Sequence, residues 1–354
     1  MLELRSAEGA FDAIDAWLGE RGFFAPGGED LVADLYLGYG LSETIRRRSS
    51  PPPPEPCPLP LAAVSLRETA KVGPGHPTVG PWERTWSTAE YAGAVEAVRS
   101  AIAAGDVYQV NLVQHLSAPF AGEPRALAAS LAQLRPLVSR PLVGNDWTIV
   151  SASPELFLSR RGRVVRTMPI KGTRPAGDAA DLIASSKDAA EHVMIVDLER
   201  NDLSRVCEPG SVRWPTLMNP EKMAGVEHLV STVEGTLREG VGLAELLTAM
   251  FPGGSITGAP KIAAVDLIAA LEPVGRGASM GALGWVKGNG DLELALTIRT
   301  FAVAEEKIHF WVGGGVVWDS DPVEEVEESW TKAVPILDAI GAPLPVAVTN
   351  GAAL

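Results

Sequence analysis

The chain has 354 residues, of which 46% are hydrophobic and 21% charged, and its formal net charge is −14. This is the composition of a globular protein with a sizeable core, and the negative charge argues against nucleic acid or an anionic membrane as partner. Two cysteines, Cys57 and Cys207, are too few for a disulfide framework or a zinc site. The N-terminus lacks a signal-peptide pattern, and no run reaches the roughly 18 apolar residues of a membrane span. We therefore expect a soluble, cytoplasmic protein.

The chain divides at a proline-rich tract. Residues 1–60 form a short N-terminal segment, which ends in RRRSSPPPPEPCPLP at 46–60. This tract predicts an extended connector. Residues 86–341 carry the main α/β pattern, and we expect the N-terminal segment to be part of the same fold.

The first elements of that region follow from local signals. Ser87 and Glu90 have the spacing of a capping box and predict a helix that ends near Gly105. A strand is expected at 107–116. The segments TIVSASPELFLSR and RVVRTMPI then predict two strands, joined as a hairpin across Arg161–Gly162.

The second half of the region adds two helices and another hairpin. Residues 181–206 predict one long helix, and 293–317 predict a hairpin that turns at Glu305–Lys307. Residues 320–341 predict a final helix with Ser320 as its N-cap. Adjacent hairpins favour an α/β sandwich of two largely antiparallel sheets flanked by helices, and no dinucleotide or P-loop motif stands in the right context.

Two pairs of carboxylates have the same spacing on the two long helices. Asp188 and Glu191 are three residues apart on the first, and Glu325 and Glu328 are three apart on the last, so each pair lies on one face. Four carboxylates brought together would favour a hard cation such as Mg²⁺. Alternatively, the pairs are only the solvated faces of acidic helices. Lys332 follows Glu328 at the spacing of a helix ion pair.

Two glycine-rich stretches are candidates for anion binding. FPGGSITGAPK at 251–261 places glycines, Ser255 and Thr257 before a predicted helix, an arrangement that offers backbone N–H groups to an anion. WVGGGVV at 311–317 predicts a bulge or a close approach of a ligand to a strand, and Arg299 is expected on the partner strand. The alternative is that these glycines serve turns alone.

Eight ordered segments resemble the chorismate-utilising enzymes, a family that includes the large subunits of anthranilate and aminodeoxychorismate synthases and the isochorismate and salicylate synthases. They are SPELF (153–157), PIKGTRP (169–175), AEHVMIVDLERNDLSRV (190–206), HLVST (228–232), FPGGSITGAPK (251–261), LTIRT (296–300), GGGVV (313–317) and EEVEESWTK (324–332). The resemblance covers 86–341 and implies the two-sheet sandwich expected above.

The resemblance also implies a metal and substrate site. Mg²⁺ would bind the ring carboxylate of chorismate through Glu191 and Glu328, with Asp188 and Glu325 as water-linked outer carboxylates. Where this chain has Asp188, the family usually has Glu. The residues implied in holding the substrate's anionic groups are Arg299, Gly313, Gly314, Gly315, Lys332, Thr257 and Gly258.

Two positions distinguish the branches of the family. Gln109 stands where isochorismate and salicylate synthases carry a water-activating lysine, which favours the ammonia-using branch. Lys171 in PIKGT resembles the lysine of aminodeoxychorismate synthases, which attacks C2 of chorismate before ammonia enters at C4. Glu155 matches the acid that protonates the departing hydroxyl, and His228 is implied near the ring as an acid, a base or an orienting group. A lysine nucleophile must be neutral, so we expect the site to lower the pKa of Lys171.

The implied function is that of an aminodeoxychorismate synthase component for p-aminobenzoate and folate synthesis. The chain encodes no glutaminase, so ammonia would come from a separate glutamine amidotransferase subunit, and a separate lyase would act downstream. The alternatives are an anthranilate synthase or another ammonia-using chorismate enzyme that carries Lys171, and a catalytically silent chorismate-binding regulator.

Overall fold

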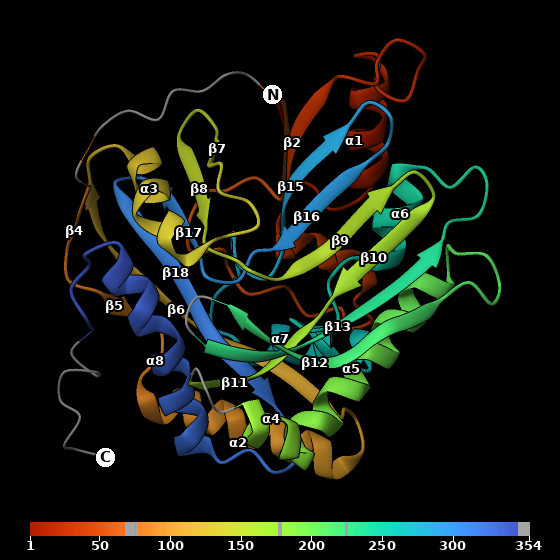
Figure 1. Ribbon diagram of the computed structural model, residues 1–354. Coiled ribbons are helices and arrows are strands. Elements are labelled where there is room, and N and C mark those ends of the chain that lie inside the picture. The colour runs from red at the N-terminus through yellow and green to blue at the C-terminus, as the bar shows by residue number, and fades with distance from the viewer. Residues whose placement is uncertain (68–74, 76, 176–178, 224–225, 346–354) are drawn as a thin grey trace.

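The computed structural model describes residues 1–67, 75, 77–175, 179–223 and 226–345 (Figure 1). Among these residues the strands form two antiparallel sheets, and helices lie against both of them. None of the helices in the described ranges is both long enough and apolar enough to span a bilayer.

The larger sheet has ten strands among the described residues, in the order β1-β3-β2-β15-β16-β9-β10-β13-β11, with β12 paired to the free side of β13. Strands from both ends of the chain meet in it, because β2 pairs with β15. The strands are β1 (Leu2–Leu4), β2 (Val32–Leu37), β3 (Ala62–Leu66), β9 (Leu156–Arg161), β10 (Val164–Met168), β11 (Ile170–Pro175), β12 (Arg213–Met223), β13 (Val226–Thr236), β15 (Ala282–Lys287) and β16 (Leu292–Leu296).

The smaller sheet has eight strands in the described ranges, in the order β14-β6-β18-β17-β8-β7, and β4 and β5 also pair with β6. Its centre is the long β6–β18 pair, which Figure 1 shows running through the molecule. The strands are β4 (Thr78–Val79), β5 (Glu83–Arg84), β6 (Gln109–Ala121), β7 (Leu142–Val143), β8 (Trp147–Ser151), β14 (Gly258–Ala259), β17 (Thr300–Ala304) and β18 (Lys307–Val316).

Helices pack on strands of both sheets, and two pairs of helices that are distant in sequence pack against each other. Helix α8 lies on β18 beside α2, α7 lies on β6, α5 lies on β13, and α1 packs against α6 (Figure 1). The helices are α1 (Ala10–Gly19), α2 (Thr88–Ala104), α3 (Leu127–Leu131), α4 (Ala179–Ala184), α5 (Ser186–Ser204), α6 (Leu243–Met250), α7 (Lys261–Leu271) and α8 (Pro322–Ala339), with 3₁₀ turns η1 (Tyr39–Ile45), η2 (Pro124–Ala126) and η3 (Ala132–Leu134).

The short-range predictions are confirmed. Ser87 Oγ accepts from the amide of Glu90 at 3.2 Å and the Glu90 carboxylate accepts from the amide of Ser87 at 2.7 Å, so the capping box is complete. Strands β9 and β10 form the first hairpin. Strands β17 and β18 form the second, with Glu305 and Glu306 at φ 50° and 59° in its turn, as a tight two-residue hairpin requires.

Two predicted segments each contain one strand fewer than the structure shows, because the chain crosses from one sheet to the other within them. Residues 148–160 divide into β8 of the smaller sheet and β9 of the larger one, and 293–317 divide into β16, β17 and β18. Arg299 therefore lies in the second crossing, at φ 51°, and not on the hairpin strand expected for it. Alternating hydrophobicity is the same in both sheets, so it does not reveal a change of sheet.

Three further predictions are corrected. The predicted helix at 181–206 is two helices, α4 and α5. The N-cap of α8 is Asp321, which accepts from two amides of the first turn, while Ser320 instead donates to Glu325 Oε1 at 2.6 Å. The glycines of 313–315 do not form a bulge, because each pairs in unbroken register with β6.

The two crossings lie against each other. The amide of Leu296 donates to the carbonyl of Glu155 at 3.0 Å, and the amide of Ala152 donates to the carbonyl of Arg299 at 2.9 Å. Glu155 and Arg299, 144 positions apart in the sequence, are therefore fixed at one junction between the sheets.

Close packing of the larger sheet predicts opposite effects for two glycine-to-alanine substitutions. A Cβ at Gly284 of β15 would lie 1.9 Å from the carbonyl oxygen of Glu293, whereas one at Gly93 in α2 would meet no atom within 4 Å. We expect Gly284→Ala to lower the free energy of unfolding by about 3 kcal/mol through overpacking. Gly93→Ala should raise it by about 0.5–1 kcal/mol through helix propensity. Urea unfolding of both variants checks this, and equal midpoints would contradict it.

Candidate active site

Lys171 is held at an irregularity of β11. The pairing of β11 with β13 shifts register between Lys171 and Arg174, and Gly172 there adopts φ 65°, which favours glycine. The Lys171 side chain is only 11% exposed. Its Nζ lies 2.8 Å from Glu191 Oε1 of α5 and donates to the carbonyl of Ser255 at 3.3 Å.

Glu155 lies next to this lysine, in the first crossing between the sheets. It is buried, and its Oε1 accepts from Ser255 Oγ at 2.8 Å and from the amide of Ile170 at 3.4 Å. Burial raises the pKa of Glu155, against the opposing effects of Lys171, these hydrogen bonds and Arg299. A raised pKa favours the protonated carboxyl group, which is the form that can donate a proton to a leaving group.

The electrostatics of Lys171 differ from the expectation. Burial opposes its charge, but the adjacent Glu191 carboxylate, together with Glu155 and Glu199, outweighs burial and raises the pKa of Lys171 above its ordinary value. We expected the site to lower this pKa, but the charged side chains that act on the amine are acidic and raise it. In the ligand-free protein Lys171 is therefore a buried ammonium ion.

Glycines of β18 let the acidic helices approach the strand. The same Glu191 oxygen that pairs with Lys171 accepts from Gln109 Nε2 at 3.1 Å. A Cβ at Gly315 would lie 2.3 Å from that Gln109 nitrogen and 3.0 Å from the Glu191 oxygen. A side chain at this position would displace the Gln109 amide or the Glu191 carboxylate, so glycine allows their close approach to the strand.

The neighbouring glycine faces the second carboxylate pair. A Cβ at Gly314 would lie 3.3 Å from Glu325 Oε2 and 3.7 Å from Glu328 Oε1, both on α8. The predicted helix ion pair is present, with Lys332 Nζ 2.6 Å from Glu328 Oε1, and Lys332 also donates to the carbonyl of Gly313 at 3.3 Å. The α5 and α8 carboxylates thus border successive residues of one strand.

The donor chemistry of this region fits Mg²⁺. Carboxylate oxygens of Glu191, Glu325 and Glu328 face the glycines of β18, and hard oxygen ligands are those that Mg²⁺ prefers. Across the described residues no three His, Cys, Asp or Glu side chains form a ready metal centre. The side chain of Asp188, the fourth predicted carboxylate, lies outside the described residues.

The segment 251–261 is fixed on β6. The amide of Asn111 donates to the carbonyl of Thr257 at 2.9 Å, and Gly258, at φ 134°, lies so close to Gln109 that a Cβ would be 2.2 Å from its carbonyl oxygen. The amides of Thr257 and Gly258, expected to face an anion, instead donate to the carbonyl of Gly254 at 3.2 and 3.1 Å. The segment's clearest contribution is Ser255, which contacts both Lys171 and Glu155.

His228 joins the site through the backbone beside Lys171. It is buried on β13, and its Nδ1 lies 2.9 Å from the carbonyl oxygen of Gly172. Arg299 is half-buried and close enough to Glu155 for the two to affect each other's pKa, and desolvation lowers the pKa of Arg299 while Glu155 opposes that change. The predicted residues thus border one region where the two sheets, α5 and α8 meet.

Sequence reasoning missed Glu199. This α5 residue is 4% exposed, and its Oε2 accepts from Thr167 Oγ1 at 2.9 Å. Burial, and next the charge of Glu155, raise the pKa of Glu199 to about 8. A signal existed, since Glu191, Ile195 and Glu199 follow at intervals of four and so share a helix face.

Comparison with known proteins places the chain in a family. The model of the chorismate binding enzyme family matches residues 46–338. Anthranilate synthase component 1 of Streptomyces coelicolor is 40% identical over 323 residues, which cover 88% of this chain and 60% of the relative. Aminodeoxychorismate synthase component 1 of Bacillus subtilis is 40% identical over 265 residues, which cover 72% of this chain and 56% of the relative. The chain therefore belongs to the family of chorismate-binding enzymes.

The structural comparison agrees and confirms the predicted fold class. The crystal structure of anthranilate synthase component I from Streptococcus pneumoniae matches with a TM-score of 0.76 at 27% identity, covering 86% of this chain and 80% of that one. The fold is thus of the anthranilate synthase component I type. The chain spans only about 60% of the length of the curated relatives it matches.

The raised pKa of Glu199 predicts that the stability of the protein depends on pH. The folded pKa of this glutamate, about 8, exceeds the ordinary 4.5, so the folded state binds this proton more tightly. The resulting stabilisation is complete below about pH 4.5 and is lost as the pH rises through 8. Glu199→Gln keeps an acceptor for Thr167. Relative to this variant, we expect the free energy of unfolding of wild type to fall by a few kcal/mol between pH 5 and 8.5. Urea unfolding across this range measures the difference.

The matched control for this experiment is Asp197→Asn, which alters an exposed carboxylate on the same helix. Its pH dependence should follow that of wild type. Parallel curves for wild type and Glu199→Gln would contradict the assigned proton.

Proposed function

We propose that this chain acts as an aminodeoxychorismate synthase component 1, which replaces the C4 hydroxyl of chorismate by an amino group. The observation that carries this proposal is the placement of Lys171 beside Glu155, with Ser255 in contact with both. In this arrangement the nucleophile can attack one carbon while the adjacent acid protonates the group that leaves another carbon.

The proposed chemistry has two displacements. In the first, the Lys171 amine forms a bond to C2, the ring double bonds shift, and the C4–oxygen bond breaks as Glu155 gives its proton to the departing hydroxyl, which leaves as water. In the second, ammonia forms a bond to C4, the double bonds shift back, and the bond between C2 and Lys171 breaks. The buried, high-pKa Glu155 suits the acid role.

Lys171 must lose its proton before it attacks. Its ion pair with Glu191 stabilises the ammonium form, so the nucleophile is held in reserve in the ligand-free protein. When bound at Glu191 and Glu328, Mg²⁺ would supply the charge that holds the ring carboxylate and would take Glu191 away from the Lys171 ammonium. Arg299 and Lys332 are the cations proposed to hold the remaining anionic groups, which is needed in a chain of net charge −14.

Ammonia is proposed to come from a glutamine amidotransferase subunit. The relatives named above are both called component 1. Cys57 and Cys207 are buried, and burial raises the pKa of both thiols, so neither has the properties of a glutaminase nucleophile. A separate lyase would convert the product to p-aminobenzoate for folate synthesis.

The second candidate is anthranilate synthase component 1. The Streptomyces relative with that name is as similar to this chain as the Bacillus aminodeoxychorismate synthase, at 40% identity each. Both reactions start from chorismate and ammonia, so the product distinguishes them. Incubation of the full chain with chorismate, Mg²⁺ and ammonium, followed by mass spectrometry with and without an added lyase, identifies it. Anthranilate fluorescence would overturn our assignment.

Lys171→Ala removes the proposed nucleophile. We expect aminodeoxychorismate formation to fall at least about 100-fold while chorismate still binds, because the lysine acts in the bond-forming steps. Product formation is measured by mass spectrometry and binding by calorimetry. Lys287→Ala, on an exposed residue of β15, is the control and should keep full activity. An unchanged rate in Lys171→Ala would remove the covalent role.

Glu328→Gln tests the proposed metal ligand. Replacing a carboxylate by an amide weakens a Mg²⁺ site, so we expect the Mg²⁺ concentration for half-maximal activity to rise about tenfold or more. Glu327→Gln, at the adjacent exposed position of α8, is the matched control. A Mg²⁺ titration that is the same for wild type and Glu328→Gln would refute the ligand assignment.

A further inference from the structure

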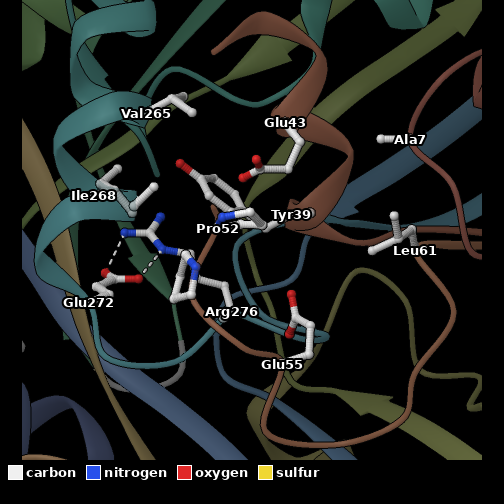
Figure 2. A pocket seen from close by; sticks show the side chains of 14 residues that line it. Ala7, Tyr39, Glu43, Pro52, Glu55, Leu61, Val265, Ile268, Glu272 and Arg276 are labelled. Atoms are coloured by element: carbon white, nitrogen blue, oxygen red, sulfur yellow. Dashed lines mark hydrogen bonds and ion pairs between the residues drawn. The ribbon is translucent and has the colours of Figure 1, made fainter. Parts of the chain in front are cut away.

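A cavity of about 350 Å³ lies apart from the Lys171 site, between η1, the proline-rich segment and α7. Figure 2 shows it, with the carboxylates of Glu43 and Glu55 turned toward the same space as the Arg276 side chain. We call it the η1–α7 cavity. It is large enough for a small organic molecule, and it contains none of the residues assigned to the active site.

Much of the cavity wall is apolar. Hydrocarbon side chains come from the segment after β1, from the proline-rich segment and from one face of α7. They are Ala7, Pro52, Pro53, Leu61, Val265, Ile268 and Ala269. Such walls fit the body of a ligand that has few polar groups of its own.

The charged groups of the cavity leave one acid without a cation. Arg276 forms a fork with Glu272, at 2.8 and 2.7 Å, and also donates to the carbonyls of Ile256 and Asn111 at 3.0 and 2.5 Å. Four of its five N–H groups are therefore engaged, and its charge is balanced by Glu272.

The other two glutamates differ in their partners. Glu43 is paired with Arg46 at 2.6 Å. Glu55 accepts a hydrogen bond from the amide of Gly277 at 2.9 Å, but within the described part of the chain it forms no ion pair. Burial raises the pKa of Glu55 to about 7, and the charges of Glu43 and Glu272 add to that effect. Glu55 is thus a carboxyl group without a cation partner in the described part of the chain, and a bound cation would favour its ionised form.

We propose that the η1–α7 cavity binds a small primary amine with an apolar body, with the ammonium group on Glu55 and the hydrocarbon part against Leu61 and Ile268. A ligand carboxylate is disfavoured there, because three glutamates border the cavity and the charge of Arg276 is already balanced by Glu272. The cavity therefore selects amines over amino acids and over anions. This inference does not depend on the proposed reaction, because it uses none of the residues of the Lys171 site.

The experiment uses the full chain and three probes of the same length: n-hexylamine, n-hexanol and hexanoate. Calorimetric titration at pH 8 is expected to show one hexylamine per chain, with hexanol at least about tenfold weaker and hexanoate weaker still. Equal affinities for hexylamine and hexanol would overturn the ammonium site. So would tighter binding of hexanoate, or no binding of any probe at millimolar concentration.

Two variants localise the binding. Glu55→Gln, which keeps an acceptor for Gly277, should weaken hexylamine about tenfold and leave hexanol unchanged. Ala269→Phe should fill the cavity and abolish binding of both probes, which distinguishes it from hexylamine bound to the carboxylates of the Lys171 site. Glu96→Gln, on an exposed residue of α2, is the control and should bind like wild type. Thermal unfolding verifies that each variant is folded, and unaltered hexylamine binding in Glu55→Gln or Ala269→Phe would refute the proposal.

Discussion

The buried ion pair between Arg276 and Glu272 is the constraint on which the arrangement of the site depends. Their side chains are 1% and 3% exposed, and the pair ties α7 to two other segments. Glu272 accepts from the amide of Val113 on β6, and Arg276 donates to Asn111 on the same strand and to Ile256 in the loop before α7. Loss of either partner would leave a buried charge, which typically costs about 3–5 kcal/mol.

That ion pair affects the site because Arg276 holds Ile256, and the residue before Ile256 in the loop is Ser255. With Ile256 fixed, Ser255 offers its hydroxyl to Glu155, in the first crossing between the sheets, and its carbonyl to Lys171 of β11. The loop thus sets the spacing between the proposed acid and the proposed nucleophile. The same pair forms one wall of the η1–α7 cavity, so the two faces of the loop region depend on one electrostatic contact.

The site balances its acids with its own lysines when no ligand is bound. Lys171 pairs with Glu191 and Lys332 with Glu328, so the two proposed metal ligands each hold an ammonium group. This explains why the acidic neighbourhood raises the pKa of Lys171, where a nucleophile alone would need it lowered. An ammonium ion and a metal cation compete for the same oxygen, which links the state of the lysine to occupancy of the site.

The sequence by itself determined the features that depend on residues close along the chain. The Ser87 capping box, the turn at Glu305 and the helix pair of Glu328 and Lys332 each need only a fixed spacing of a few residues. Family motifs added the candidate site residues, because the order and spacing of these motifs can be read without any knowledge of the fold.

Only the tertiary structure decided which sheet each strand joins and what charge surrounds each site residue. The crossings at Glu155 and Arg299 have the same hydrophobic alternation as uninterrupted strands, so only the pairing of distant strands reveals them. The burial of Glu199 likewise depends on what packs against its helix face, and the high pKa of Lys171 depends on acids that converge from α5 and from the first crossing between the sheets. Spacing is a local property of the chain, whereas desolvation and Coulomb interactions depend on distances that exist only in the folded protein.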